Sequence, residues 1–272
     1  VMAGTFVLTV SLILCMIFVP KKNALDTLQK REAKAKETGK MTEEQLAKQK
    51  ANGSESDDTI CTADLTDDEI LEGLNLLLIG DSIAVDVTDD FYEMFPNSVS
   101  DTKIGRITSL GKQVLDSYID EKKWEGEGVI FASLSNSPIN GELEDIREKI
   151  GKDMPLFLTT VRIPHDTFEE ESNSKIKKFV EENDHTYLID WYAASEGHDE
   201  YFDADDTHLL PAGAKAYAKC IKEAVLAAYK KENIEIPKSR LSSGADTSTD
   251  SSNASSTDSN TDSSNDNRTD TS

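Results

Sequence analysis

Short apolar runs alternate with longer amphipathic stretches through the middle of the chain. The runs that we predict to be strands are Leu74–Ile79, Val129–Leu134, Leu156–Val161 and Tyr187–Ile189, with a weaker one at Val99–Ile104. The predicted helices between and after them are Val85–Phe95, Leu110–Lys123, Leu143–Ile150, Lys175–Glu182 and Ala212–Lys230. Continuous apolar runs bounded by polar turns suit strands covered on both faces, and their alternation with helices favours a parallel sheet. The pattern predicts a three-layer α/β/α domain over residues 65–232, large enough for its own core.

The two ends of the chain have a different character. Residues 1–20 carry no charge and would reach roughly 28 Å as a helix, which predicts a transmembrane helix at the end of a truncated membrane domain. A signal peptide that lacks its start is the alternative interpretation. Residues 21–64 are polar and predict a stalk or linker, either a solvated helix or a loose segment. Residues 233–272, mostly Ser, Thr, Asp and Asn, predict a disordered tail.

Charge is spread unevenly along the chain. The net charge is −23, of which residues 21–52 contribute +4, residues 241–272 contribute −5, and the remainder carries −22. Such an acidic domain argues against nucleic acid as a partner and favours neutral or cationic ones. The lysines and arginine that follow residue 20 would favour a cytoplasmic flank, whereas the acidic domain and tail look extracellular.

A serine stands where the first apolar run ends. The run Leu76–Ile83 contains the corner Gly80-Asp81-Ser82, so that Ser82 follows a predicted strand and precedes a predicted helix. A helix N-terminus favours negative charge, which suits a serine nucleophile. The plainer interpretation is that Ser82 only caps the helix.

A histidine with a carboxylate three residues before it lies far downstream. His208 and Asp205 belong to a polar loop that precedes the last predicted helix. Asp205 could orient the imidazole and stabilise its cationic form, as a general base for Ser82 requires. The acidic loop lacks the glycine and the final glutamate of a Ca²⁺-binding loop, so we predict no metal and no cofactor.

Acyl transfer also needs donors for the oxyanion that develops on the substrate. Gly105 could offer a backbone N–H, and Asn136 could offer a side-chain amide after the second long strand. Taken singly, a glycine in a turn and an asparagine in a loop are common. Their order along the chain, Ser82, Gly105, Asn136 and then Asp205-x-x-His208, strengthens the hypothesis.

With these residues in that order, the domain resembles the SGNH, or GDSL-type, hydrolase family over nearly all of residues 70–230. More narrowly, it resembles the extracellular SGNH domain that follows an acyltransferase-3 membrane domain in bacterial peptidoglycan O-acetyltransferases. The stretches that carry this likeness are Val161-Arg162-Ile163-Pro164, Asp190–Ser195 with Gly197-His198, and Asp205–Leu209.

The resemblance implies a flavodoxin-like fold, Ser82 as nucleophile, His208 as base and Asp205 as its partner. It also implies an oxyanion hole made of the Ser82 N–H, Gly105 and Asn136. The expected function is a cell-surface O-acetyltransferase, anchored by one membrane span with its catalytic domain outside the cell. An upstream membrane acyltransferase domain would deliver the acetyl group, and a wall glycan would accept it. The alternatives are a surface carbohydrate acetylesterase and a non-catalytic wall-binding module.

The sequence departs from the family pattern near the asparagine. A glycine usually lies two residues before it and another often follows, whereas this chain has Leu134 and Ser137. The shape of the loop around Asn136 is therefore open. An extracellular domain would also allow a disulfide between Cys61 and Cys220, and two free thiols fit the sequence equally well.

Overall fold

The structure is a computed structural model that describes residues 26–27, 29–50 and 58–241. The predicted membrane helix over residues 1–20 and most of the predicted tail, residues 242–272, lie outside these ranges. Among the residues that the structure describes, no helix is both long and apolar enough to cross a bilayer.

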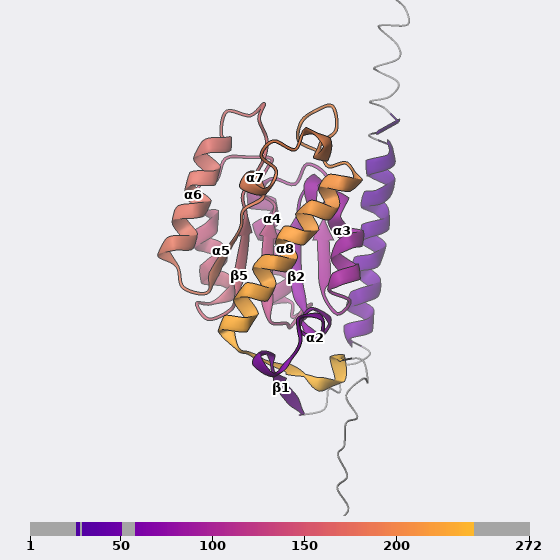
Figure 1. Ribbon diagram of the computed structural model, residues 1–272, viewed down its shortest axis with the longest axis vertical. Coiled ribbons are helices and arrows are strands. Elements are labelled where there is room, and N and C mark those ends of the chain that lie inside the picture. Colours follow the sequence, from indigo (N-terminus) through magenta and orange to yellow (C-terminus); the bar gives the residue numbers. More distant parts are fainter. Residues whose placement is uncertain (1–25, 28, 51–57, 242–272) are drawn as a thin grey trace, which may run out of the picture. The chain divides into compact units, whose positions relative to one another are not determined.

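A five-stranded parallel sheet forms the centre of the domain, as the strand pattern predicted (Figure 1). Its spatial order is β3-β2-β4-β5-β6, and Leu77 of β2 pairs with Val99 of β3 on one side and with Val129 of β4 on the other. The strands are β2 (Leu76–Gly80), β3 (Val99–Thr102), β4 (Gly128–Ala132), β5 (Leu156–Thr159) and β6 (Thr186–Ile189). Successive strands are added on opposite sides of β2, so the carboxyl ends of β2 and β4 form a topological switch point, where open α/β sheets usually bind ligands.

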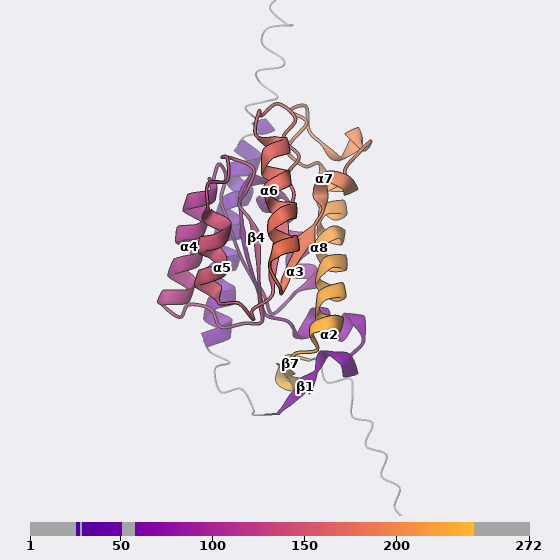
Figure 2. The same cartoon turned by 90° about the vertical axis from the view of Figure 1, so that its left-hand side faces the viewer.

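Helices cover both faces of this sheet, which explains why β2, β4 and β5 are buried at every position (Figures 1 and 2). Leu76 and Leu78 of β2 join the core on one face, while Leu77 and Ile79 join the core on the other. The first face is covered by α2 (Asp67–Gly73), α3 (Ser82–Met94), α7 (Trp191–Ala194) and α8 (Pro211–Glu232). The second face is covered by α4 (Thr108–Asp120), α5 (Glu142–Ile150) and α6 (Glu169–Glu182).

The turn from β2 into α3 is tight, and Gly80 makes it possible. A Cβ atom at Gly80 would lie 2.1 Å from the Cβ of Ala84, far inside van der Waals contact. Without that atom, the first turn of α3 can start directly at the end of the strand. The apolar strand and the glycine together thus set Ser82 at the carboxyl edge of the sheet.

The segments that flank the domain contact it in the structure, whereas their composition predicted a solvated helix or a loose segment before it and disorder after it. Residues 26–27 and 29–50, in the predicted stalk or linker, are helical, and we call them the flanking helix. Its Gln45 and Gln49 side chains donate to the backbone carbonyls of Pro96 and Asn97, at 2.6 and 2.9 Å. This helix is therefore bonded to the domain along one face rather than solvated all round.

The carboxyl end of the domain also differs from the prediction of disorder from residue 233 onward. A short strand, β7 (Glu235–Pro237), pairs antiparallel with β1 (Thr59–Cys61), and Ile236 is fully buried. Three short 3-10 helices complete the described elements: η1 (Thr62–Asp64), η2 (Asp199–Tyr201) and η3 (Lys238–Arg240). Cys61 and Cys220 are both free thiols, so the structure does not contain the disulfide that an extracellular domain would allow.

Candidate active site

Ser82, His208 and Asp205 form one hydrogen-bonded chain. The Nε2 atom of His208 lies 3.0 Å from the Oγ atom of Ser82, and its Nδ1 atom lies 2.7 Å from Oδ2 of Asp205. Ser82 is the first residue of α3, and the other two residues lie in the loop before α8. The structure thus brings together three side chains from segments more than 120 residues apart.

The hydrogen-bond pattern of Asp205 fixes which nitrogen of His208 carries the hydrogen. Asp205 Oδ1 accepts the backbone N–H groups of Thr207 and His208, at 3.2 and 2.9 Å, while Oδ2 accepts from His208 Nδ1. Burial acts to raise the pKa of Asp205, but the bonds from His208 and Thr207 and the charge of His208 outweigh it, so this pKa lies below its ordinary value. Because an ionised Asp205 can only accept, Nδ1 is the donor and Nε2 is free to accept the Ser82 hydroxyl proton.

Asp86 joins the helix of Ser82 to the loop of His208. It lies one turn after Ser82 on α3, and its Oδ2 atom accepts the backbone N–H of Leu209 at 3.2 Å. Burial raises the pKa of Asp86, whereas the charge of Arg31 and the Leu209 N–H act to lower it. One helix therefore holds both the serine and an anchor for the residue next to His208.

Asn136 is connected to the serine corner through Asp81 and Ser135. Asp81 is fully buried, and its Oδ1 atom accepts the Ile83 N–H at 3.0 Å at the start of α3. Its Oδ2 atom accepts both the backbone N–H and the hydroxyl of Ser135, and the Asn136 amide donates to that hydroxyl oxygen at 3.3 Å. Burial raises the pKa of Asp81, and the bonds from Ser135 and Ile83 oppose this rise. The loops after β2 and β4 are thereby tied together.

Gly105 lies in the turn after β3, on the other side of Ser82. Its φ is +68°, in the left-handed region that favours glycine, and a Cβ atom there would meet nothing within 4 Å. The neighbouring Arg106 is buried, and its guanidinium donates to the Gly80 carbonyl at 3.0 Å and to that of Asp101. Arg106 therefore fastens the Gly105 turn beside the Gly80-Asp81-Ser82 corner.

The two departures from the family pattern both have structural roles. Leu134 is fully buried in the core that α4 and α5 cover, and it fills space there. The Ser137 hydroxyl oxygen accepts the Thr108 backbone N–H at 3.1 Å, so Ser137 caps the N-terminus of α4. With Leu134 and Ser137 in these places, Asn136 still lies in the loop after β4.

Apolar side chains surround the carboxyl edge of the sheet. Among the described residues, the large hydrophobic side chains that are exposed are Ile107, Leu110, Tyr192 and Leu210. Each lies in or next to a loop that follows a strand or precedes α4 or α8 at this edge. The Arg162 guanidinium lies over the rings of Tyr192 and Phe202, 5.6 and 5.8 Å from their centroids. An arginine beside exposed apolar and aromatic side chains suits a polar ligand with apolar faces, such as a sugar.

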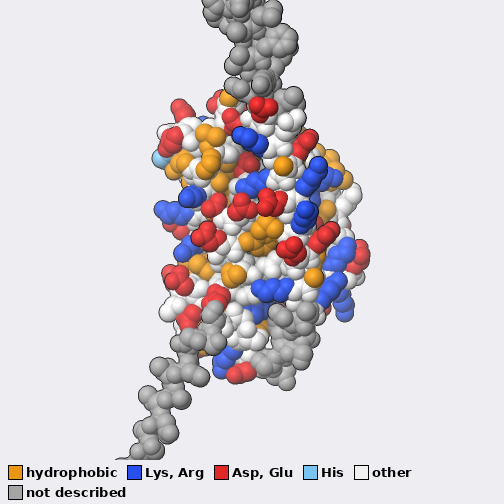
Figure 3. Space-filling model, turned by 90° about the vertical axis from the view of Figure 1, so that its right-hand side faces the viewer, with side chains coloured by type: hydrophobic (Ala, Val, Ile, Leu, Met, Phe, Trp, Pro, Cys, Tyr) orange, Lys and Arg blue, Asp and Glu red, His pale blue; other side chains and the backbone are white. Residues whose placement is uncertain are grey.

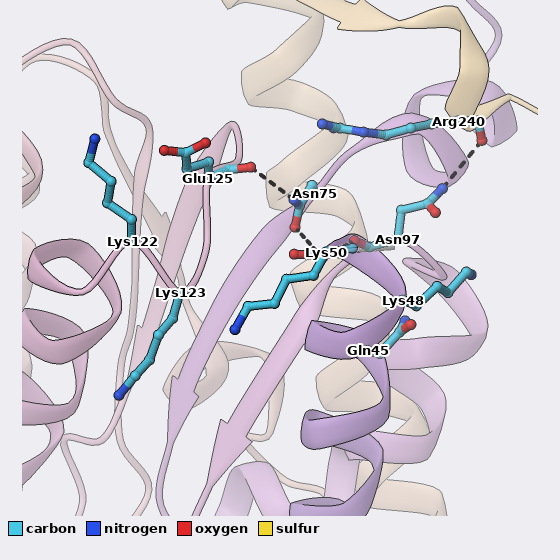
Figure 4. Close-up of a pocket in the computed structure, with 10 residues that line it drawn as sticks. Gln45, Lys48, Lys50, Asn75, Asn97, Lys122, Lys123, Glu125 and Arg240 are labelled. Atoms are coloured by element: carbon cyan, nitrogen blue, oxygen red, sulfur yellow. Dashed lines mark hydrogen bonds between the residues drawn. The ribbon is translucent and has the colours of Figure 1, made fainter. Parts of the chain in front are cut away.

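A cavity of about 390 Å³ lies at the opposite edge of the sheet from Ser82 (Figure 4). Asn75 and Asn97 in its wall precede β2 and β3, so it lies at the amino ends of the strands. Lysines from two segments line it, and Figure 4 shows Lys48 and Lys122 on opposite sides. It is not part of the Ser82 site.

Several residues of the site are not predicted by the sequence pattern. Asp81 stands beside Ser82, and Ser135 stands beside Asn136, but their pairing across two loops has no local signal. Asp86 could have been found from its spacing, because a carboxylate four residues after Ser82 shares its helix face. Arg106 follows Gly105 directly, yet its buried bonds to backbone carbonyls depend on the fold.

No protein-family model matches the chain. In sequence it is 34% identical over 146 residues to the O-acetyltransferase OatA of Staphylococcus aureus, a match covering 53% of this chain and 24% of that protein. A second Staphylococcus aureus protein, provisionally named an O-acetyltransferase, is 30% identical over 165 residues, or 60% of this chain and 26% of its own length. The chain thus matches about a quarter of the length of these relatives.

In structure the chain is similar to the C-terminal catalytic domain of peptidoglycan O-acetyltransferase A of Streptococcus pneumoniae, solved with a methylsulfonyl adduct. The TM-score is 0.54 at 20% sequence identity, and the match covers 61% of this chain and 99% of that one. The resemblance found in the sequence is therefore confirmed: the chain contains an α/β domain of SGNH-like fold with sequence similarity to bacterial O-acetyltransferases.

Proposed function

We propose that this chain is the catalytic part of a cell-surface O-acetyltransferase. The observation that carries the proposal is the hydrogen-bonded chain of Ser82, His208 and Asp205, in a domain similar to bacterial O-acetyltransferases. Residues 1–20 would anchor the enzyme in the membrane, and an upstream membrane acyltransferase domain would supply the acetyl group on the outer side. The acceptor would be a hydroxyl group of a wall glycan.

In the first step, the Ser82 oxygen attacks the carbonyl carbon of the acetyl donor while His208 Nε2 takes the hydroxyl proton. Asp205 holds the resulting imidazolium, and the proton passes to the leaving group of the donor. In the second step a sugar hydroxyl attacks the acetyl-Ser82 ester, His208 takes its proton, and that proton returns to the Ser82 oxygen. The first step thus exchanges the bond between the acetyl carbonyl carbon and the leaving group for a bond to the Ser82 oxygen, and the second exchanges that bond for one to the sugar oxygen.

The oxyanion that forms in both steps needs donors on the face of the carbonyl away from His208. We assign this role to the backbone N–H groups of Ser82 and Gly105 and to the side-chain amide of Asn136. The bonds from Arg106 to Gly80 and from Ser135 to Asp81 support this assignment, because they fasten both donor loops beside Ser82.

An acetylesterase with the same residues is the second candidate. It is favoured by the openness of the site, since the Asp205 side chain is 47% exposed and water can reach the loop of His208. Transfer and hydrolysis differ only in whether a sugar hydroxyl or water attacks the ester. Tyr192 and Arg162 would bind the acceptor sugar in the first case and the acetylated glycan in the second.

The test incubates the full chain, kept in detergent, with an aryl acetate as donor and with chitooligosaccharides or muropeptides as acceptors. Mass spectrometry then follows the acetyl group. An acetylated sugar supports the transferase, acetate alone at a rate independent of acceptor supports the esterase, and no turnover supports a wall-binding module. Ser82→Ala must abolish turnover, whereas Ser117→Ala, on α4 and bonded only within its own helix, should leave it intact. Tyr192→Ala should lower acetyl transfer to the sugar several-fold while leaving hydrolysis of the aryl acetate unchanged.

A further inference from the structure

The flanking helix reaches the loop that carries His208. One end is held at the edge strand β3, where the Thr42 hydroxyl donates to the Ser100 carbonyl. Near the other end, the Lys34 ammonium donates to the Asp86 carbonyl at 2.9 Å and lies 3.4 Å from the Asp89 carboxylate on α3. Figure 1 shows this helix in indigo alongside α3, and Figure 3 shows acidic and basic side chains interspersed over this face of the molecule. A segment far upstream of Ser82 therefore lies against the helix that Ser82 begins.

Arg31 makes the most specific contact of this helix. Its Nη2 atom donates to Asp203 Oδ2 at 2.9 Å, and its Nη1 atom lies 3.9 Å from Asp205 Oδ2. The second oxygen is the one that accepts the His208 Nδ1–H. The guanidinium side chain is only 16% exposed, so solvent screens these contacts less than those of a surface pair.

We propose that Arg31 is a positioning residue for the Ser82 site, acting through Asp203 and Asp205. This inference rests on the proposed function, which makes Ser82, His208 and Asp205 a catalytic site. The carboxylates that Arg31 contacts are those of Asp203 and Asp205, so it would act through them rather than on the reacting atoms.

Arg31 would act in two ways. First, it anchors the turn of residues 203–208, because the Asp203 backbone N–H also donates to the His208 carbonyl at 2.8 Å and closes that turn. Second, its charge competes with the imidazolium for Asp205. The contact distances put the guanidinium within about 7 Å of the imidazole, where like charges in a partly solvated site repel appreciably.

The other charged groups near this site are known from its neighbouring elements. They are Asp81 directly before α3, Asp86 on α3, Lys34 on the flanking helix, Asp203 and Asp206 in the loop of His208, and His165, which lies 3.2 Å from Asp206. Arg31→Met removes a cation from a mainly acidic set, so it leaves the imidazolium better stabilised. The acid limb of the pH profile should therefore move to higher pH, by about half a unit to one unit.

The experiment compares full chains with Arg31→Met, Arg31→Lys and Lys30→Met. Lys30 is an exposed cation on the same helix, so its loss is the matched control for charge. For aryl acetate hydrolysis, we expect Arg31→Met to lower kcat/KM about tenfold and to shift the acid limb upward. Arg31→Lys should keep the acid limb of the pH profile in its original place but not the full kcat/KM, because an ammonium cannot reproduce the guanidinium geometry. Lys30→Met should match the unaltered chain in both.

Hydrogen exchange provides a readout that does not need turnover. The backbone amides of His208 and Leu209, which bond to Asp205 and Asp86, should exchange faster in Arg31→Met than in Lys30→Met. The proposal is overturned if Arg31→Met matches Lys30→Met in exchange or, where the chain turns over, in its pH profile. Failure of the proposed function is a different result, namely that Ser82→Ala keeps full turnover or that the unaltered chain has none; the exchange comparison then still decides the role of Arg31.

Discussion

Replacing Asp205 with Asn tests the hydrogen-bonded chain at a single atom. In Asp205→Asn the amide oxygen can take the place of Oδ1 and still accept the Thr207 and His208 backbone N–H groups. The amide NH₂ group then faces His208 Nδ1, which is itself a donor. The conflict is relieved only if the ring hydrogen moves to Nε2, where it points at Ser82 and blocks proton acceptance. The turn should therefore survive while the base is lost.

The expected loss is roughly 10³–10⁴-fold in kcat/KM, the scale found for this change in other Ser-His-Asp sites. The free energy of unfolding should change by less than about 1 kcal/mol, because both backbone bonds remain. Asp205→Ala also removes those bonds and should cost about 1 kcal/mol of stability, a modest figure because the side chain is half exposed. Aryl acetate kinetics and urea unfolding measure the two quantities separately.

Asp206→Asn is the matched control for this experiment. Asp206 is the adjacent carboxylate, it is exposed, and its side chain contacts His165 rather than the site. Its φ of +55° is one that asparagine tolerates, so the change should leave activity within about twofold. If Asp205→Asn instead kept a tenth or more of the activity, the role given to Asp205 would be refuted.

Three further predictions concern pH and the glycines. Because the pKa of Asp205 is lowered in the folded chain, the carboxylate stabilises the fold fully above its unfolded pKa of about 3.9, and this contribution is lost as the pH falls through the folded pKa. The difference in unfolding free energy between Asp205→Ala and the unaltered chain, measured by urea unfolding, should therefore narrow below about pH 4. A difference that stays constant with pH would contradict this prediction. In Gly105→Ala the new methyl group contacts no neighbour, but alanine is strained at the positive φ of this position. We expect a loss of about 1 kcal/mol in stability and a fall of about tenfold or more in kcat/KM. Unchanged kinetics would show that Gly105 is not part of the oxyanion hole. Gly80→Ala should destabilise the fold by about 1–3 kcal/mol through its clash with Ala84, and adding Ala84→Gly should recover part of that loss in the same unfolding assay.

The central sheet could be predicted because its strands are covered on both faces. Leu76–Gly80 and Leu156–Thr159 are buried at every position, so each appears in the sequence as an uninterrupted apolar run. The pairing of β1 with β7 could not be predicted, since each strand has three residues and their partners are more than 170 positions apart. Short strands of this kind carry too few residues for a periodic signal.

The site could be predicted only for the residues that we propose to perform the chemistry directly. Ser82 and His208 belong to residue types that acyl transfer needs, and they stand at recognisable places in the pattern. The flanking helix is different, because polar side chains such as Gln45 and Gln49 bond it to backbone carbonyls. Glutamines on a polar helix are typical of a solvated face as well, so the sequence alone does not separate a docked helix from a free one.

The strand order explains why residues so far apart along the chain converge on Ser82. β2 lies between β3 and β4, so the loop of Gly105 and the loop of Asn136 leave the sheet on either side of the serine. Each of these loops is fastened to the β2–α3 corner by a buried charged residue, Arg106 on one side and Asp81 on the other. The loop of His208 is fastened from α3 by Asp86 and from the flanking helix by Arg31. Loss of any of these anchors should therefore lower turnover, since each holds a loop in place at the carboxyl edge of the sheet.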